Sequence, residues 1–469
     1  MQYVSTRGKA PPLGFSDVLL SGLATDGGLY LPVEWPNFTV DDLVASLGPN
    51  PSYQEVALEI LCPFTSQMLS REELNGLIED AYATFSHPDI APLKEIGDNI
   101  WILELFHGPT LAFKDVALQL VGQLFDYELA KRQERITIVG ATSGDTGSAA
   151  IEACRDREAI DIFILHPHGR TSDVQRRQMT TVESTNVHNI AIEGTFDDCQ
   201  DIVKAMFLEE DFRSKHNLSA VNSINWARVM AQTAYYWWAA ICLRGKGGQL
   251  LEYSVPSGNF GNVFAGYAAH LMGLDLAQFV VGSNNNDVLD RFFQSGEMEA
   301  TKVVPTLSPS MDIQIPSNFE RLLFEIHDRD GERVESDLEK FRNSGNLRIG
   351  QKKLTELQAL WTSARIDDEK TLSTISDIYN LTGDLVDPHT AVGIAAAKER
   401  RKCVDSPIVC LATAHPGKFP EAVLEATGVS PDLPLHLSDL HSRKEHYSVL
   451  PNDLNTVKDH VETIIGSFS

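Results

Sequence analysis

Residues 251–273 read LEYSVPSGNFGNVFAGYAAHLMG, so an apolar strand, a glycine-rich turn and an apolar helix follow one another directly. Such a turn presents unpaired backbone N–H groups and the positive end of the helix to an anion. It lacks the Lys-Ser/Thr pair of a nucleoside-triphosphate site and the glycine spacing of a dinucleotide site. We therefore expect it to bind a compact phosphate monoester, although chain reversal alone also explains glycines at such a place.

Short apolar segments and amphipathic helices alternate from about residue 100 onward. This alternation is typical of an α/β fold in which helices cover both faces of parallel sheets, with ligands at the carboxyl ends of the strands. The predicted strands are Ile102–Leu105, Arg135–Val139, Asp161–Leu165, Val187–Ile192, Leu250–Val255, Phe279–Val281 and Ile408–Leu411. The predicted helices that follow them are Val116–Lys131, Gly147–Cys154, Asp197–Leu208, Ala227–Leu243 and Val263–Leu271.

The domain organisation is predicted from changes in pattern along the 469 residues. Residues 1–95 are turn-rich and then helical, at Val40–Leu47 and Tyr53–Leu69, and are interpreted as an N-terminal cap domain. Residues 96–435 carry the alternating strands and helices and are interpreted as the core. Residues 436–469 are interpreted as a C-terminal tail, because the periodicity fades there.

Composition excludes several classes of protein. Lys and Arg number 39 against 65 Asp and Glu, a formal net charge of −26 that disfavours nucleic-acid binding. No apolar run reaches the ~18 residues of a membrane-spanning helix, and no signal or transit peptide is evident. The six cysteines lack metal-ligand spacing, so no metal site is expected. We expect a cytoplasmic protein without a membrane partner.

Two further segments place reactive groups beside predicted helices. Residues 141–147, ATSGDTG, crowd hydroxyls and backbone donors at a helix start, where they suit a carboxylate or a second phosphate, or simply cap the helix. Residues 107–115, HGPTLAFKD, place Lys114 at the start of an apolar helix. Burial and the positive helix end both lower the pKa of such a lysine and favour an amine nucleophile. The alternative is a first-turn lysine that reaches solvent.

The last segment, residues 411–418, reads LATAHPGK and follows the final predicted strand. Thr413 there offers a neutral hydroxyl to a heteroaromatic nitrogen, or simply forms a turn. Together these segments provide the groups of a pyridoxal 5′-phosphate (PLP) site: a lysine nucleophile, a glycine-rich turn for a phosphate, a hydroxyl-rich loop for an anion and the hydroxyl of Thr413.

With these segments in hand, the sequence resembles the threonine synthase family, PLP enzymes of fold type II, in its longer-chain type. The resemblance extends along the chain through YVSTRG, DGGLYLP, HGPTLAFKD, ATSGDTG, SINWAR, PSGNFGN, DPHTAVG and ATAHPGKFPEA. It implies that residues 96–435 form a two-lobed catalytic core, with a smaller lobe at roughly 115–225 and a larger lobe from the remainder. It also implies a lyase of threonine biosynthesis that converts O-phospho-L-homoserine and water to L-threonine and phosphate. The oligomeric state, monomer or homodimer, stays open.

The resemblance also assigns roles to residues. It implies that Lys114 attaches PLP covalently and that Thr413 meets its pyridine nitrogen. It implies that one loop holds the cofactor phosphate: Gly258, Asn259, Phe260, Gly261 and Asn262. It implies substrate-carboxylate contacts from Thr142, Ser143 and Thr146, and substrate-phosphate contacts from Thr146, Ser223 and Arg228.

Asp145 departs from the wider fold type. Many relatives place Asn at this position, against the phenolic oxygen of the cofactor, where a carboxylate would repel a phenolate. Longer threonine synthases share the Asp, so it supports the narrower family and leaves its own role open.

Other functions remain compatible with the same segments. The alternatives are a PLP lyase that yields 2-oxobutyrate, a serine/threonine dehydratase, a catalytically silent PLP-binding protein and a non-enzymatic anion-binding module. The STRG and DGGLYLP region disfavours the dehydratase, and Lys114 disfavours the silent protein.

Overall fold

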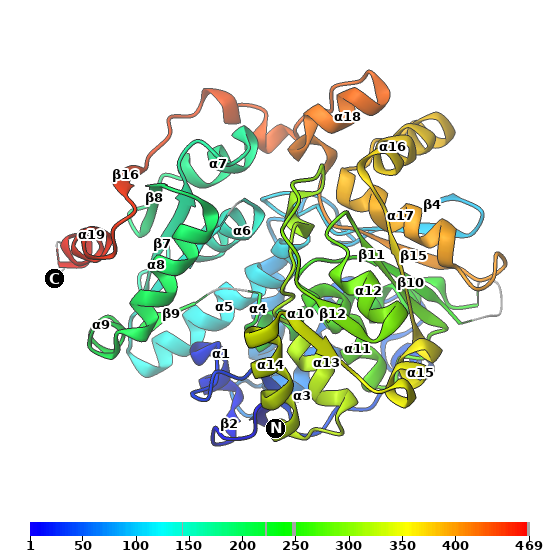
Figure 1. The fold of residues 1–469 in the computed structure, drawn as a ribbon, viewed down its shortest axis with the longest axis horizontal. Helices are drawn as coiled ribbons and strands as arrows, with labels where there is room; N and C mark the ends of the chain where they lie inside the picture. The colour runs from blue at the N-terminus through cyan, green and yellow to red at the C-terminus, as the bar shows by residue number, and fades with distance from the viewer. Residues whose placement is uncertain (143, 221–222, 246–249, 467–469) are drawn as a thin grey trace.

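The computed structural model describes residues 1–142, 144–220, 223–245 and 250–466. These residues form two α/β lobes and an N-terminal region that share one continuous apolar core (Figure 1). The predicted α/β class with parallel sheets is confirmed.

The larger lobe is built on a six-stranded sheet in the order β14-β11-β10-β15-β5-β4. All neighbours are parallel except the edge strand β4, which runs antiparallel to β5. The strands are β4 Leu93–Gly97, β5 Ile100–Glu104, β10 Glu252–Pro256, β11 Gln278–Ser283, β14 Trp361–Arg365 and β15 Ile408–Ala412.

Both faces of this sheet are buried, which explains the continuous apolar runs in its strands. Ile408 and Cys410 face one apolar cluster, whereas Val409 and Leu411 face the other, because successive strand residues point to opposite faces. Helices that pack on or beside the sheet are α10 Trp226–Leu243, α11 Gly261–Leu271, α12 Val288–Ser295, α16 Asp368–Thr382 and α17 Pro388–Arg400.

The smaller lobe has a five-stranded parallel sheet in the order β16-β8-β7-β6-β9. Its strands are β6 Ile136–Ala141, β7 Ile160–Pro167, β8 Val187–Glu193, β9 Leu218–Ser219 and β16 Ser448–Pro451. Its helices are α5 Lys114–Arg132, α6 Asp145–Cys154, α7 Asp173–Thr180, α8 Phe196–Leu208, α9 Glu210–Lys215 and α19 Leu454–Gly466.

Strand β16 and helix α19, which lie in the segment interpreted from the sequence as a tail, pack on the smaller lobe. Strand β16 pairs with β8, and Val457 and Val461 of α19 are fully buried against Cys199 of α8 and the sheet. Figure 1 shows this red segment against the green elements of the lobe. Sequence periodicity missed it because β16 is a short edge strand whose burial comes from long-range pairing.

The N-terminal region packs into the shared core. Its elements are β1 Gln2–Ser5, β2 Leu13–Gly14, α1 Phe15–Ser21, β3 Tyr30–Pro32, α2 Val40–Leu47, α3 Tyr53–Thr65 and α4 Arg71–Tyr82. Helix α3 packs on α10 and α4 packs on α5. The expected boundary at residue 95 falls inside β4, so residues 93–97 belong to the large sheet.

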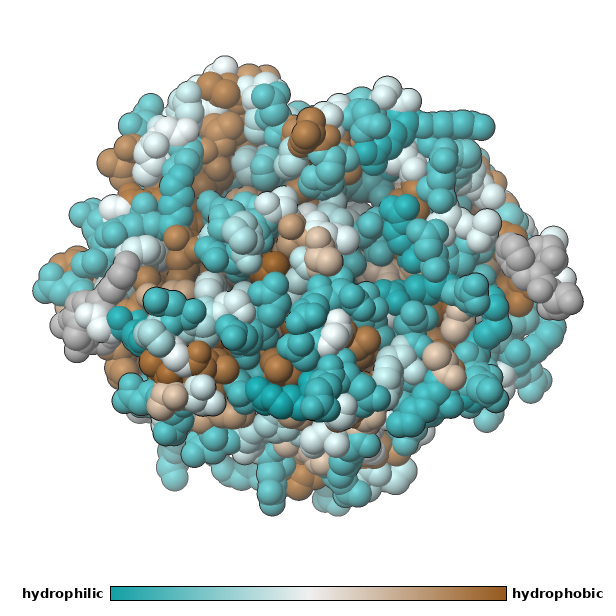
Figure 2. All heavy atoms as spheres, turned by 180° about the vertical axis from the view of Figure 1, so that it is seen from behind, coloured by the Kyte–Doolittle hydropathy of each residue, from teal (hydrophilic) through white to brown (hydrophobic). Residues whose placement is uncertain are grey.

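Smaller elements complete the larger lobe and the surface. They are β12 Glu297–Glu299, η1 Pro309–Met311, α13 Phe319–Ile326, α14 Gly331–Ser344, β13 Asn346–Arg348, α15 Gln351–Leu360, η2 Pro416–Lys418, α18 Pro420–Thr427, η3 Leu435–Leu437 and η4 Leu440–Ser442. Figure 2 shows a largely hydrophilic face on which hydrophobic residues form small separate patches. None of the helices in the described part of the chain is long and apolar enough to cross a bilayer.

Candidate active site

Lys114 and Thr413 are brought together by backbone pairing. The chain leaves β5, turns at Leu111 with a left-handed φ of 62°, and forms an antiparallel bridge between Ala112 and Ala414. The N–H of Phe113 then donates to the carbonyl of Thr413 at 2.9 Å. Helix α5 begins at Lys114, so the lysine and the end of β15 share one site.

The Lys114 side chain is buried, as expected for an amine nucleophile. Its Nζ lies 3.4 Å from Oδ2 of Asp145. Burial lowers the pKa of Lys114 to about 8; Asp145 opposes this shift, and the positive charges of Arg228 and Lys418 add to it. A substantial fraction of this amine is therefore neutral near physiological pH and able to attack a carbonyl or take a proton.

Besides Lys114 of α5, groups from two further elements contact Asp145. Its Oδ1 accepts from Nε2 of Gln175 on α7 and from Nζ of Lys418 on η2, each at 2.8 Å. Burial alone raises the pKa of Asp145, but the charges of Lys418 and Lys114 more than reverse this and hold it well below its ordinary value. The residue is therefore a carboxylate at every physiological pH.

Thr110 connects this cluster to a second buried carboxyl. Its Oγ1 donates to Oδ1 of Asp115 at 2.6 Å, and its N–H donates to Oδ2 at 2.8 Å. Burial raises the pKa of Asp115 to about 6 despite these hydrogen bonds. The Thr110 carbonyl accepts from Nζ of Lys418 at 2.7 Å and from Nε2 of Gln178 at 3.0 Å.

The hydroxyl-rich loop stands at the carboxyl end of β6. The Thr142 hydroxyl accepts from the N–H groups of Gly144 and Gly147, both at 3.0 Å, and thereby shapes the loop and the first turn of α6. Thr146 is half-buried in that turn. Ser143 lies outside the described residues. The contacts of Thr142, Ser143 and Thr146 with the substrate carboxylate stay predictions.

The glycine-rich turn joins β10 to α11, as the sequence predicts. Phe260 has a left-handed φ of 65° and is fully buried, its ring centroid 5.3 Å from that of Phe319 and 5.6 Å from that of Trp361. A Cβ on Gly258 would lie 2.9 Å from Cα of Met311, so the close approach of another backbone requires glycine there. Aromatic packing and this contact fix the course of the turn.

The segment that contacts Gly258 is itself supported by a buried histidine. The N–H of Ser310 donates to Nε2 of His389 at 3.2 Å, which places the ring proton on Nδ1, 2.7 Å from Oδ2 of Asp387. The DPHTAVG motif, residues 387–393, thus holds in place the segment that packs against Gly258 of the glycine-rich turn.

Asn262 leaves a buried donor without a partner. Its Oδ1 accepts from the hydroxyls of Tyr235 and Tyr236, at 2.5 and 3.0 Å, which orients the amide. Its Nδ2 is buried and has no hydrogen-bond partner in the described structure. The amide nitrogen can therefore donate to a ligand oxygen.

Arg228 also has a buried donor without a hydrogen-bond partner in the described structure. It lies in the first turn of α10, is 4% exposed, and its Nη1 has no hydrogen-bond partner within the described ranges. Burial lowers the pKa of Arg228 to about 10, with a small opposing contribution from Tyr235, seven residues along the same helix. Since a buried guanidinium strongly favours an anionic partner, this is a natural place for a phosphate.

Ser223 precedes α10 and is half-buried. Its carbonyl accepts from Nδ2 of Asn318 at 3.0 Å. Arg321, fully buried, donates to the carbonyl of Ile224 at 2.6 Å and also contacts Asn318. The larger lobe thus positions the segment that leads into Arg228.

The sequence did not reveal every member of the site. Lys418 stands inside the quoted segment 411–418, but its role depends on a contact with Asp145, 273 positions earlier in the chain. Gln175, Tyr235 and Tyr236 carry no motif at all. Their only sequence signal is a polar group within an otherwise apolar or amphipathic helix.

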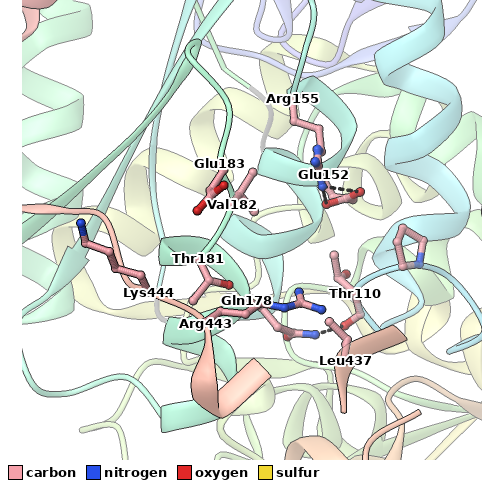
Figure 3. Close-up of a pocket in the computed structure, with 11 residues that line it drawn as sticks. Thr110, Glu152, Arg155, Gln178, Thr181, Val182, Glu183, Leu437, Arg443 and Lys444 are labelled. Atoms are coloured by element: carbon pink, nitrogen blue, oxygen red, sulfur yellow. Dashed lines mark hydrogen bonds and ion pairs between the residues drawn. The ribbon is translucent and has the colours of Figure 1, made fainter. Parts of the chain in front are cut away.

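A cavity of about 360 Å³ lies between α6, α7 and residues 437–444, and Figure 3 shows the side chains that line it. Thr110 and Gln178 line it together with Arg155, Arg443 and Lys444. None of the described site residues that the sequence predicts lines this cavity. Among the described residues, no group of three or more His, Cys, Asp or Glu is arranged to hold a metal ion.

Comparisons with known proteins follow the whole chain. It matches the family "Threonine synthase N terminus" over residues 2–82, "Pyridoxal-phosphate dependent enzyme" over 86–338 and "Threonine synthase, C-terminal" over 390–461. A threonine synthase from Pseudomonas aeruginosa is 52% identical, over 98% of this chain and 97% of its own. One from Saccharomyces cerevisiae is 41% identical, over 98% and 97%.

Solved structures agree with these matches. The crystal structure of PLP-bound threonine synthase from Brucella melitensis has a TM-score of 0.95 and 50% identity, covering 99% of each chain. The yeast threonine synthase structure has a TM-score of 0.93 and 39% identity, with the same coverage.

Proposed function

The chain belongs to the threonine synthase family, and from that premise we propose that it is a PLP-dependent lyase that converts O-phospho-L-homoserine and water to L-threonine and inorganic phosphate. The observation that carries the proposal is a buried lysine amine, Lys114, in a site where two buried donors, Arg228 Nη1 and Asn262 Nδ2, have no protein partner. A cofactor with an aldehyde and a phosphate, and a substrate with a second phosphate, satisfy all three groups.

The residues present fit PLP. The amine of Lys114 has the depressed pKa that attack on an aldehyde needs, and the turn before α11 offers backbone donors and Asn262 Nδ2 to a phosphate. We assign the cofactor phosphate to residues 258–262. We assign the pyridine nitrogen to Thr413, because its backbone is paired with Phe113, next to Lys114.

When bound, PLP supplies an electron sink that stabilises negative charge at the substrate carbon next to the amine. The protein supplies the proton transfers and the positions of the charged groups. One proton leaves Cα and one leaves Cβ, the bond between Cγ and the phosphate oxygen breaks, and protons return to Cγ and Cα. Water adds its hydroxyl to Cβ, and its remaining proton leaves with the phosphate.

Lys114 is the group we assign to the proton transfers at Cα and Cβ. A buried amine with a pKa of about 8 accepts and returns a proton at comparable cost near neutral pH. We assign the substrate phosphate to Arg228, Ser223 and Thr146, and the substrate carboxylate to Thr142, Ser143 and Thr146. A guanidinium that is already desolvated binds a phosphate more strongly than a solvated one does.

The remaining proposals concern the molecule as a whole. Its partner is a small-molecule substrate. We propose a cytoplasmic location, which suits the absence of a disulfide among the six cysteines, all of which lie in described residues. We propose that residues 448–466 belong to the smaller lobe together with the sheet of residues 136–219.

The function is tested by incubating the purified protein with O-phospho-L-homoserine and PLP and measuring phosphate, threonine and 2-oxobutyrate together. We expect phosphate and threonine in equal amounts. Phosphate with 2-oxobutyrate would mean a lyase that lacks water addition, and no phosphate at all would reject the substrate.

A further inference from the structure

The site contains a second buried lysine for which the proposed reaction has no use. Lys418 is 1% exposed and follows Pro416 in the short helix η2. Its Nζ lies 2.8 Å from Oδ1 of Asp145 and donates to the carbonyl of Thr110 at 2.7 Å. Such a deeply buried ammonium is retained only when it is paired, so its partners indicate its role.

Asp145 stands between the two lysines but is bound unequally by them. Its Oδ1 is taken by Lys418 and by Gln175, both at 2.8 Å, whereas its Oδ2 lies 3.4 Å from Nζ of Lys114. The closer ion pair is therefore with Lys418. Without that pair, the carboxylate would face Lys114 as its only cationic partner among the described residues.

We propose that Lys418 is a positioning residue: it binds the Asp145 carboxylate and so prevents Lys114 from being held as an ammonium ion in a tight pair. The amine of Lys114 then stays available to react with the cofactor. This inference rests on the proposed function, since it takes Lys114 as the lysine that attaches PLP.

The charges around Lys114 agree with this arrangement. Asp145 of α6 favours the ammonium form of Lys114, whereas Arg228 of α10 and Lys418 of η2 disfavour it. Lys418 also faces two further titratable groups, Asp115 and His415. Burial raises the pKa of Asp115 and the charge of Lys418 opposes that shift, whereas burial lowers the pKa of His415 and the charge of Lys418 adds to that shift.

The anchor of Lys418 explains why it keeps its place. The Thr110 carbonyl accepts from both Lys418 and Gln178, and the Thr110 N–H and hydroxyl hold Asp115. A structural role of Lys418 through Thr110 is therefore the alternative explanation, and the experiment has to separate charge from anchoring.

The test compares native protein with Lys418→Met, Asp145→Asn, the double variant and Gln178→Met. Full-length protein is stripped of cofactor, mixed with PLP at a series of pH values, reduced with borohydride at short times, and mapped to find the modified lysine. The measured quantity is the pH midpoint of the rate of capture at Lys114. Gln178→Met is the matched control, because it removes a hydrogen bond to Thr110 without changing charge.

We expect the Lys418→Met midpoint to move to higher pH by about one unit, which is about tenfold slower capture well below the midpoint. Asp145→Asn should move it to lower pH, and the double variant should fall between the two single variants. Gln178→Met should leave it unchanged. The opposite signs of the two single variants are what a charge role requires and a packing role does not.

An unchanged midpoint in Lys418→Met, or a shift that Asp145→Asn does not reverse, would overturn the inference while leaving the proposed function in place. Capture of PLP by native protein at a lysine other than Lys114 would overturn both.

Discussion

Two parts of the site handle buried polar groups in opposite ways. In the paired cluster, formed by Lys114, Asp145 and Lys418, the Asp145 carboxylate lies 2.8 Å from Nζ of Lys418 and 3.4 Å from Nζ of Lys114. In the open donors, Arg228 Nη1 and Asn262 Nδ2, buried N–H groups have no partner in the described structure. In the first arrangement the close ion pair between Asp145 and Lys418 exists before any ligand arrives, whereas the second arrangement is completed only by a ligand.

The difference has an energetic consequence. A buried polar group without a partner costs about 1–3 kcal/mol, so the open donors destabilise the ligand-free protein. An anion that binds there recovers this cost, which makes the same groups effective for binding. The paired cluster contributes reactivity, and the open donors contribute affinity. Substitutions should therefore affect the two regions differently.

Lys114→Ala should have the largest effect on activity. Without its amine, the protein loses the group we assign to covalent attachment and proton transfer, and threonine formation should fall by at least about 1,000-fold. The measurement is the rate of phosphate and threonine release. Lys131→Ala, at the far end of the same helix, is the matched control and should retain native activity; comparable loss in both variants would contradict the assignment.

Arg228→Met should separate function from stability. Loss of the guanidinium should lower kcat/KM for the phosphorylated substrate by about 100-fold, roughly 3 kcal/mol of a charge-assisted hydrogen bond. The ligand-free variant should be at least as stable as the native protein, because a buried charge whose Nη1 donor has no partner in the described structure is removed.

Arg321→Met is the control for this prediction. Arg321 is also buried, but it donates to the carbonyls of Tyr30 and Ile224. Its removal should lower the free energy of unfolding by about 3 kcal/mol, measured by denaturant titration. If both arginine variants were destabilised to the same extent, Arg228 would be a structural residue and the comparison would fail.

Asn262→Asp tests the second open donor at nearly constant shape. Replacing the Nδ2 donor by a carboxylate oxygen should weaken PLP binding by about tenfold, equivalent to about 1.4 kcal/mol. Cofactor affinity is measured by fluorescence titration. Asn380→Asp on the exposed surface of α16 adds the same charge elsewhere and should leave the affinity unchanged; an equal loss would point to a general charge effect.

Asp115→Asn should have the smallest effect, and it should depend on pH. Burial raises the pKa of Asp115 to about 6 in the folded protein, above its unfolded value of about 4, so protonation favours folding. This contribution is complete below about pH 4 and is lost as the pH rises through about 6.

Asn cannot take up that proton. The stability of native protein relative to Asp115→Asn should therefore increase by about 1 kcal/mol between pH 7 and pH 5. Thermal melts of both proteins across this range give the value. A difference that does not vary with pH would show that Asp115 does not titrate there.

Much of the fold could be predicted because the central strands are buried on both faces. The run Ile408–Leu411, for example, is a strand in the structure as predicted, extended only by Ala412. The helix Val40–Leu47 has the predicted bounds. Strand β16 could not be found, because its pairing with β8 is set by distant parts of the chain.

The site residues divide in the same way, into those that local sequence identifies and those whose role depends on long-range packing. Lys114 and the turn at 258–262 lie at strand-to-helix junctions, which local sequence identifies. The ion pair between Asp145 and Lys418 and the hydrogen bonds from Tyr235 and Tyr236 to Asn262 depend on which elements pack together. Local patterns locate reactive groups, but only the packing shows which of them are already paired.

The most direct test is a crystal structure of the protein with PLP and inorganic phosphate. We expect the cofactor joined to Nζ of Lys114, its phosphate at residues 258–262 within hydrogen-bond distance of Asn262 Nδ2, and a second phosphate on Arg228. The ion pair between Asp145 and Lys418 should be unchanged. A cofactor bound away from Lys114, or Arg228 and Asn262 still without an anionic partner, would contradict the account.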